Sequence, residues 1–112
     1  MYDLHKSALF VRQLRFFAGE YARDMNAGNM VALRFIDLVE EATHFIQHNP
    51  FACVSYVEAG QHPQLATYDY RKWRVKGFPH SIFFKVDGNV ITIAGIYAQK
   101  MNIAVRFPSD MK

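Results

Sequence analysis

Three apolar segments in a row, separated by two turn sequences, restrict what this 112-residue chain can fold into. The segments lie within Tyr68–Tyr97 and are rich in the β-branched and aromatic residues that favour strands. The turns are residues 76–79 (KGFP) and 87–89 (DGN), and glycine and asparagine are typical of tight connections between antiparallel strands. This pattern predicts a β-meander of three antiparallel strands, around which the rest of the chain is organised.

The first of these strands is strongly cationic, because residues 71–76 (RKWRVK) hold four basic side chains. In a strand, Arg71 and Trp73 point to one face while Lys72 and Arg74 point to the other. Guanidinium groups at this spacing can bind phosphates or carboxylates, and the aromatic rings nearby can stack on bases. A second interpretation stays open: the aromatic residues belong to the core, and the charges keep an exposed strand soluble.

The N-terminal half predicts two amphipathic helices. Ser7 is an N-cap candidate, and apolar residues recur at helical spacing over residues 10–25. Residues 26–29 (NAGN) interrupt this pattern before a second helix, which runs from about Met30 to His48 and is ended by Asn49-Pro50. Because the connection is short, we expect an antiparallel helical hairpin whose shared apolar face is covered by the sheet.

Three further segments are expected to form short strands. Residues 1–5 (MYDLH) predict a strand that pairs with the meander, and residues 53–57 predict another. Residues 103–107 predict an edge strand, which Pro108 ends because proline occurs at sheet edges. The predicted fold class is therefore α+β, with the helical hairpin packed on one face of a small twisted antiparallel β-sheet, in one domain over residues 1–112.

Composition and charge indicate in which cellular compartment the protein acts and which kinds of partner it binds. No apolar run reaches the roughly 20 residues of a membrane helix, and the N-terminus lacks the pattern of a signal peptide. Cys53 is the only cysteine, so no internal disulfide can form. We therefore expect a cytoplasmic protein without membrane contact. The excess of basic residues lies in residues 51–112, which makes a polyanion the first partner to consider.

Patterns for metal binding and for conventional hydrolysis are weak. Glu41 and His44 have the spacing of a di-iron helix motif, and His48 lies one turn further, but the sequence lacks the second such pair and the other carboxylates. Cys53 has no activating neighbours in the sequence and is expected to be a small buried residue. No metal and no cofactor is predicted.

The order of these elements resembles the ParE branch of the RelE/ParE toxin superfamily of bacterial type II toxin–antitoxin modules, and the resemblance spans nearly the whole chain. Its fold is the α+β arrangement described above. The matching positions are Ser7-Ala8, Phe35, Val39, Glu40, Ala42, Ile46, Asn49-Pro50, Tyr70-Arg71, Arg74, Phe78-Pro79, Ile82-Phe83-Phe84 and Ile91–Tyr97.

The resemblance implies a toxin. ParE-like members poison DNA gyrase, and the long helices favour this branch, so gyrase inhibition is the expected function. An acidic antitoxin with a disordered segment would neutralise it. RelE-like members cleave messenger RNA on the ribosome with basic residues and a tyrosine, and this alternative makes the chain an endoribonuclease. A degenerate member without toxicity is the third alternative. The catalytic candidates of the RelE-like alternative are, by position, Arg71, Lys72, Arg74, Tyr97 and Lys100.

Charge pattern and resemblance together define one set of residues expected to bind the target or the antitoxin. The sequence leaves open whether the toxin forms a small homo-oligomer or a hetero-oligomer with its antitoxin. The expected binding residues are Arg71, Lys72, Trp73, Arg74, Lys76, Tyr97, Lys100 and Arg106.

Overall fold

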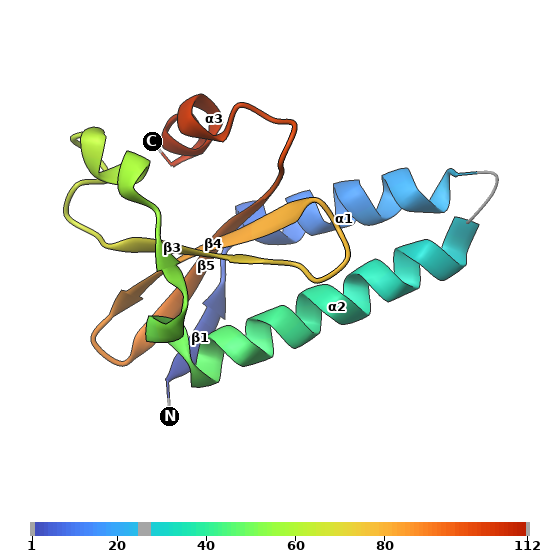
Figure 1. Ribbon diagram of the computed structural model, residues 1–112, viewed down its shortest axis with the longest axis horizontal. Coiled ribbons are helices and arrows are strands. Elements are labelled where there is room, and N and C mark those ends of the chain that lie inside the picture. The colour runs from blue at the N-terminus through green and yellow to red at the C-terminus, as the bar shows by residue number, and fades with distance from the viewer. Residues whose placement is uncertain (1, 25–27, 112) are drawn as a thin grey trace.

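The computed structural model describes residues 2–24 and 28–111, and within them a helical pair packs on one face of a five-stranded sheet (Figure 1). The strand order is β1-β5-β4-β3-β2. The predicted meander is formed by β3 (Tyr70–Arg74), β4 (His80–Asp87) and β5 (Val90–Ala98), which pair antiparallel in sequence order. Gly88 has a φ of 60° in the turn between β4 and β5, a conformation that favours glycine. The predicted α+β class is confirmed.

Two short strands complete the sheet at its edges. β1 (Asp3–Lys6) pairs with β5 in the parallel direction, and β2 (Val54–Ser55) pairs with β3 in the antiparallel direction. The predicted N-terminal strand and the strand within residues 53–57 are therefore confirmed. The sheet is mixed, because β1 and β5 run in the same direction, while the other three pairs are antiparallel as expected.

The helical pair begins at the predicted cap. The Ser7 hydroxyl accepts a hydrogen bond of 3.0 Å from the backbone N–H of Phe10, which starts α1 (Ala8–Ala22). The second helix, α2 (Gly28–His48), ends at the predicted Asn49-Pro50 and is followed by the 3₁₀ turn η1 (Pro50–Ala52). The first helix ends at Ala22, before the predicted last position, and α2 already includes Gly28 and Asn29, which were predicted to belong to the break. Residues 25–27 lie outside the described residues. No described helix is long and apolar enough to span a bilayer.

Both helices bury an apolar stripe against the sheet, and we call this cluster the hairpin-side core. Such stripes of residues three and four positions apart are what an amphipathic helix presents to a sheet. The hairpin-side core contains Phe10, Phe17, Phe35, Val39, Ala42, Ile46, Cys53, Val75, Phe78, Ile82, Phe84, Ile91, Ile93, Ile96 and Ala98.

The opposite face of the sheet carries a second cluster, which we call the outer core. It is covered by α3 (Ile103–Asp110) and by the 3₁₀ turn η2 (Val57–Gln61), and Figure 1 shows α3 at the top of the molecule and α2 at the bottom, with the strands between them. The outer core contains Tyr56, Ala59, Leu65, Tyr70, Phe83, Ala94, Tyr97 and Phe107.

The predicted edge strand over residues 103–107 is wrong, because this segment is the first part of α3. Ile103 and Phe107 are four residues apart, so a helix directs both toward the outer core, where Phe107 is fully buried. Pro108 lies inside the helix, where it cannot donate a hydrogen bond to the preceding turn, and α3 ends two residues later.

A β-bulge in β5 changes which residues face the outer core. Phe83 pairs with Gly95 while the next residue, Phe84, pairs with Ile93, so Ala94 has no partner opposite it. An extra residue reverses the alternation of the strand beyond it. Ile93 and Tyr97, which a regular strand would place on the same face, therefore lie in different cores.

The first helix holds this bulge in place. The Ser7 hydroxyl donates a 2.9 Å hydrogen bond to the carbonyl of Ala94, and the side-chain oxygen of Gln13 accepts one of 2.9 Å from the N–H of Ile96. A Cβ at position 95 would lie 3.0 Å from the Gln13 side-chain oxygen and 3.0 Å from the Tyr97 ring. Glycine at position 95 therefore allows the helix and the bulge to approach each other closely.

Candidate functional site

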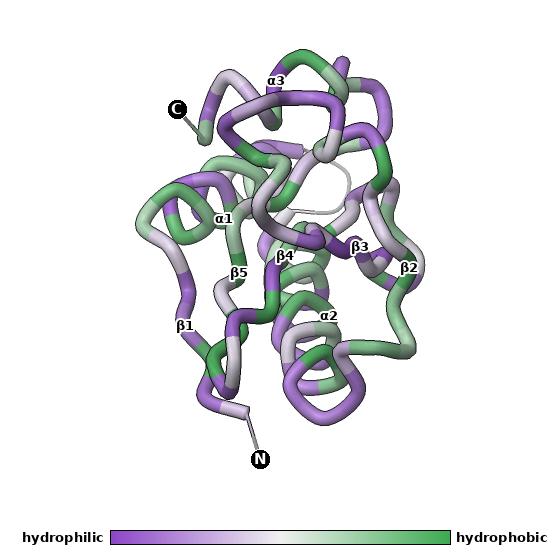
Figure 2. Tube along the Cα trace, turned by 90° about the vertical axis from the view of Figure 1, so that its left-hand side faces the viewer, coloured by the Kyte–Doolittle hydropathy of each residue, from purple (hydrophilic) through white to green (hydrophobic). Residues whose placement is uncertain are grey.

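β3 distributes its charged and aromatic side chains over both faces of the sheet, as its sequence predicts. The Trp73 ring lies on the side of the helices and stacks on Phe45 of α2, with ring centroids 4.4 Å apart and an interplanar angle of 16°. Lys72 lies opposite Phe83 and Arg74 opposite Ser81, on the face of the outer core. In Figure 2, β3 is coloured as a hydrophilic segment.

Lys72 and Arg74 line a groove of about 450 Å³ on the outer face, which we call the cationic groove. Both side chains are exposed, and among the described residues neither forms a salt bridge. Two unpaired cations next to an apolar wall attract an anionic group of a partner. The remaining walls come from Val54, Tyr56, Glu58, Trp73, Pro79, Ser81, Phe83, Gln99 and Ile103.

Tyr56 gives the groove a buried hydroxyl that the sequence analysis did not single out. Within the described part of the chain this hydroxyl has no hydrogen-bond partner. Burial, and secondly the nearby Glu58 carboxylate, raise the pKa of Tyr56 to about 12, so the hydroxyl keeps its proton at neutral pH. No local pattern around residues 51–67 indicated this position.

Arg71 is engaged within the protein. Its guanidinium donates hydrogen bonds to the carbonyl of Cys53 at 2.7 Å and to the carboxylate of Asp69 at 2.8 Å, and it lies 5.0 Å from the centroid of the Phe51 ring. Cys53 itself is buried, as expected, and burial raises the pKa of its thiol to about 11 despite the opposing Arg71 charge. Arg71 therefore connects β3 to the segment after α2.

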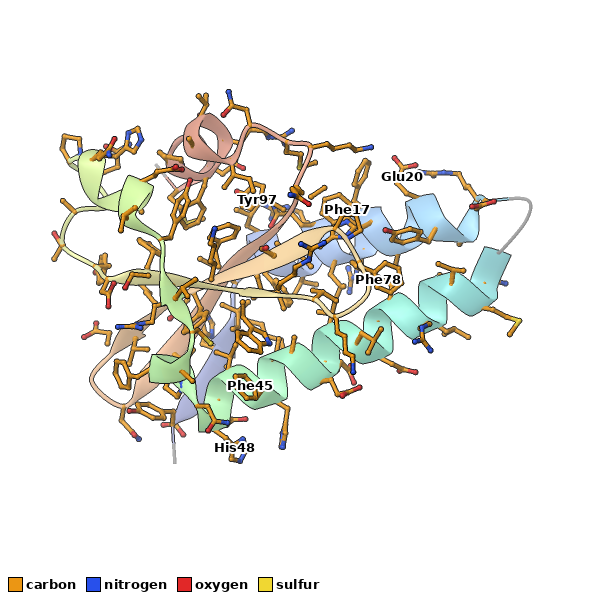
Figure 3. The ribbon with its side chains drawn as sticks, in the orientation of Figure 1. Phe17, Glu20, Phe45, His48, Phe78 and Tyr97 are labelled. Atoms are coloured by element: carbon orange, nitrogen blue, oxygen red, sulfur yellow. The ribbon has the colours of Figure 1, made fainter. Side chains whose placement is uncertain are left out.

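Tyr97 lies in the outer core and is 0% exposed, between the sheet and α3 (Figure 3). Its hydroxyl donates a 2.6 Å hydrogen bond to the carboxylate of Asp110. Burial first, and this bond second, raise the pKa of Tyr97 above its ordinary value. In this structure Tyr97 therefore supports the position of α3 and does not reach the surface that Lys72 and Arg74 share.

The other predicted binding residues are spread over the surface. Lys76 is exposed beside a hollow next to α2, and Arg106 is exposed on α3. Lys100 lines a different cavity, next to α1. The groove thus brings Lys72, Trp73 and Arg74 together, and the hollow beside α2 joins Lys76 to Trp73 and Arg74. The other predicted residues, which are Arg71, Tyr97, Lys100 and Arg106, line neither. Contact of these residues with a partner stays a prediction.

Histidines and carboxylates do not gather into a metal site in the described ranges, 2–24 and 28–111, where no three potential ligands lie together. His44 and His48 of the weighed helix motif lie on the exposed side of α2, with ring centroids 4.4 Å apart. The Nδ1 of His48 bonds to the backbone carbonyl of His44 at 2.9 Å. This pair is part of a polar helix face, the interpretation that the sequence favoured.

Comparison with solved structures gives information on the fold. The sequence matches no protein-family model and no curated protein. Among solved structures, a chain of the chromosomal ParDE TA system from P. aeruginosa superimposes with a TM-score of 0.69 and 19% sequence identity. The match covers 88% of this chain and 96% of that chain. The protein therefore has a RelE/ParE-like fold, as the resemblance in its sequence implied.

Proposed function

We propose that this protein is the toxin of a bacterial toxin–antitoxin module and that it binds and inhibits DNA gyrase. The observation that carries the proposal is the likeness of its fold, over 88% of the chain, to a chain of a ParDE system. The cationic groove supports a binding function, because it presents two exposed cations beside apolar walls.

The positions of the catalytic candidates support inhibition by binding rather than cleavage of RNA. Acid–base catalysis needs its side chains within hydrogen-bond reach of one reacting group. Lys72 and Arg74 share the groove, but the hydroxyl of Tyr97 is buried against Asp110, and Lys100 lines another cavity. A binding surface has no such requirement, since it needs only complementary charge and shape.

A supercoiling assay tests the proposed function directly. Purified protein at micromolar concentration is expected to stop gyrase from supercoiling a relaxed plasmid, and an unaffected reaction would contradict the proposal. The charge reversal Lys72→Glu/Arg74→Glu should remove inhibition. Arg12→Glu/Arg15→Glu changes the net charge equally on the exposed side of α1, away from the groove, and should retain it.

Cleavage of messenger RNA on the ribosome is the second candidate function. The observation that favours this function is that Lys72 and Arg74 are exposed in one groove, where they can hold a phosphate backbone. Primer extension on translated messages after expression would then reveal new 5′ ends, and Arg74→Ala should abolish them while the protein stays folded. Intact transcripts would exclude this function.

The proposed partner is an acidic, amphipathic antitoxin segment in the cytoplasm, where gyrase acts. Its acidic residues would meet the basic excess of residues 51–112. Expression without an antitoxin should stop growth, and coexpression should restore it. Normal growth without the antitoxin would remove both toxin functions and favour a degenerate member of the family.

A further inference from the structure

A cavity of about 700 Å³ lies between α1 and the segment that follows β5, and the proposed function does not use it. Its walls include the rings of Phe16, Phe17 and Tyr21 from α1, and Figure 3 labels Phe17 on this helix. Phe16 is 54% exposed, an unusual position for a large aromatic side chain. The cavity falls within the range of roughly 300–1,000 Å³ that small-molecule sites occupy.

His80, at the start of β4, lines this cavity and is 4% exposed. Three aromatic rings surround its imidazole, with centroids 4.5 Å away for Phe17, 4.8 Å for Phe35 and 6.0 Å for Tyr21. Burial, and secondly the charge of Lys100, lower the pKa of His80 to about 4. The imidazole is therefore neutral at neutral pH and carries one donor and one acceptor.

Within residues 2–24 and 28–111, no hydrogen bond at Nδ1 selects a tautomer of this imidazole. The Nδ1 atom of His80 is buried without a hydrogen-bond partner among the residues that the structure describes. A histidine tautomer is normally set by the bond that one ring nitrogen makes, and Nδ1 makes no such bond in the described part of the chain. The ring nitrogen that a ligand meets on His80 can therefore be a donor or an acceptor, and the ligand must be able to pair with both.

We propose that this cavity binds a small, uncharged, hydroxylated aromatic molecule of the phenol class. A hydroxyl both donates and accepts, so it suits either tautomer of His80. A planar ring packs well on the aromatic walls formed by Phe16 and Phe17. Glu20 and Lys100 line the cavity with opposite charges, which favours a neutral ligand over an acid or an amine.

Two probes of equal shape test this site in the full chain. 4-Ethylphenol carries the hydroxyl, and 4-ethyltoluene has a methyl group in its place. Titrations followed by NMR should show saturable binding of 4-ethylphenol with shifted ring signals of His80 and Phe17, at least about fivefold tighter than 4-ethyltoluene. Absence of saturable binding up to the solubility limit, or equal affinity for the two probes, would overturn the proposal.

Variants separate the hydroxyl contact from the apolar walls. His80→Phe keeps an aromatic ring among aromatic neighbours and should abolish the preference for 4-ethylphenol. If this variant does not fold, the two probes on the unchanged protein still decide. Phe16→Ala should weaken the binding of both probes, whereas Leu33→Ala, at a similarly exposed apolar position on α2, should weaken the binding of neither.

The cavity lies apart from Lys72 and Arg74, although Pro79 and Gln99 line both the cavity and the cationic groove. Lys72→Glu/Arg74→Glu changes the cationic groove and should leave the binding of 4-ethylphenol unchanged. If this variant loses gyrase inhibition but still binds 4-ethylphenol, the substitutions have affected only the cationic groove. Loss of phenol binding in this variant would contradict a separate cavity.

Discussion

The two faces of the sheet are built differently. The hairpin-side core lies under helices of 15 and 21 residues and is almost entirely aliphatic and phenylalanine side chains. The outer core lies under a helix of 8 residues and includes three tyrosines, Tyr56, Tyr70 and Tyr97, whose hydroxyls need partners. The hairpin side is thus an almost entirely apolar interior in which the imidazole of His80 is buried beside Phe17 and Phe35, and the outer face combines burial with tyrosine hydroxyls beside an open groove.

This difference separates stability from binding. Burial of apolar side chains is the main stabilising term in folding, and more buried residues belong to the hairpin-side core than to the outer core. The outer face carries the cationic groove and the short α3, whose position depends on Phe107 and on the bond between Tyr97 and Asp110. Substitutions on the two faces should therefore have distinct consequences.

The largest expected effect is global loss of stability on the hairpin side. Phe35 is fully buried, and its ring lies about 5 Å from those of Tyr21, Phe78 and His80. Phe35→Ala should lower the free energy of unfolding by about 3–5 kcal/mol, measured by chemical denaturation. Leu33→Ala, exposed on the same helix, should change it by less than about 0.5 kcal/mol. Similar losses in both variants would refute the assignment of the hairpin-side core.

Acid should destabilise the same face through His80. Its pKa is lowered to about 4 in the folded protein from an ordinary value of 6.5, so the unfolded chain binds the additional proton between these values. The free energy of unfolding therefore contains a contribution from neutral His80 that is fully present above pH 6.5. This contribution is lost as the pH falls toward 4, and the total loss is about 3 kcal/mol.

Denaturation curves between pH 7 and pH 4 measure this slope. The titratable groups that face His80 are Lys100, Glu20 and Tyr21. The control variant His80→Phe keeps all three and removes only the imidazole. His80→Phe should have a smaller loss of stability over the same interval. An identical slope in both proteins would show that other groups cause the acid sensitivity.

A smaller and local effect is expected on the outer face. Phe107 is also fully buried, with ring centroids 5.0 Å from Tyr70 and 5.1 Å from Phe83, but it belongs to the short α3. Phe107→Ala should release α3 at a loss of about 2 kcal/mol, because only the docking of this helix is weakened. Hydrogen exchange should then accelerate in α3 while β5 stays protected. Equal acceleration in both elements would indicate one cooperative unit.

The smallest effect on stability is expected in the groove itself. Lys72→Ala/Arg74→Ala removes exposed charges without a salt bridge among the described residues, so the free energy of unfolding should change by less than about 0.5 kcal/mol. Inhibition of gyrase should nevertheless fall at least about tenfold, measured as the concentration that halves supercoiling. Unchanged inhibition would move the binding surface away from this groove.

Local signals in the sequence predicted much of the fold. The cap at Ser7, the stop at Asn49-Pro50 and the turn at Gly88 each depend on a few neighbouring residues, and all three appear in the structure. The alternation along β3 correctly assigned Trp73 to one face and Lys72 with Arg74 to the other. Such features could be predicted because their causes lie within a few residues of chain.

The candidate site was predicted less completely. Lys72 and Arg74 were expected from the basic strand, whereas Tyr56 and Glu58 join them from a segment without a clear pattern. Residues 103–107 alternate weakly enough to suit a strand or a helix. Whether this segment forms a strand or a helix depends on the aromatic rings that pack against Phe107, and these rings come from distant parts of the chain.

The sequence by itself determined the helical pair, the meander and the cationic strand, since periodicity and turn chemistry act locally. Only the tertiary structure decided on which face of the sheet the Tyr97 side chain lies. The bulge at Ala94, held by Ser7 and Gln13 of the first helical segment, turns the Tyr97 ring into the outer core and away from solvent. Contacts between residues more than 80 positions apart set that alternation, and no short window of sequence contains them.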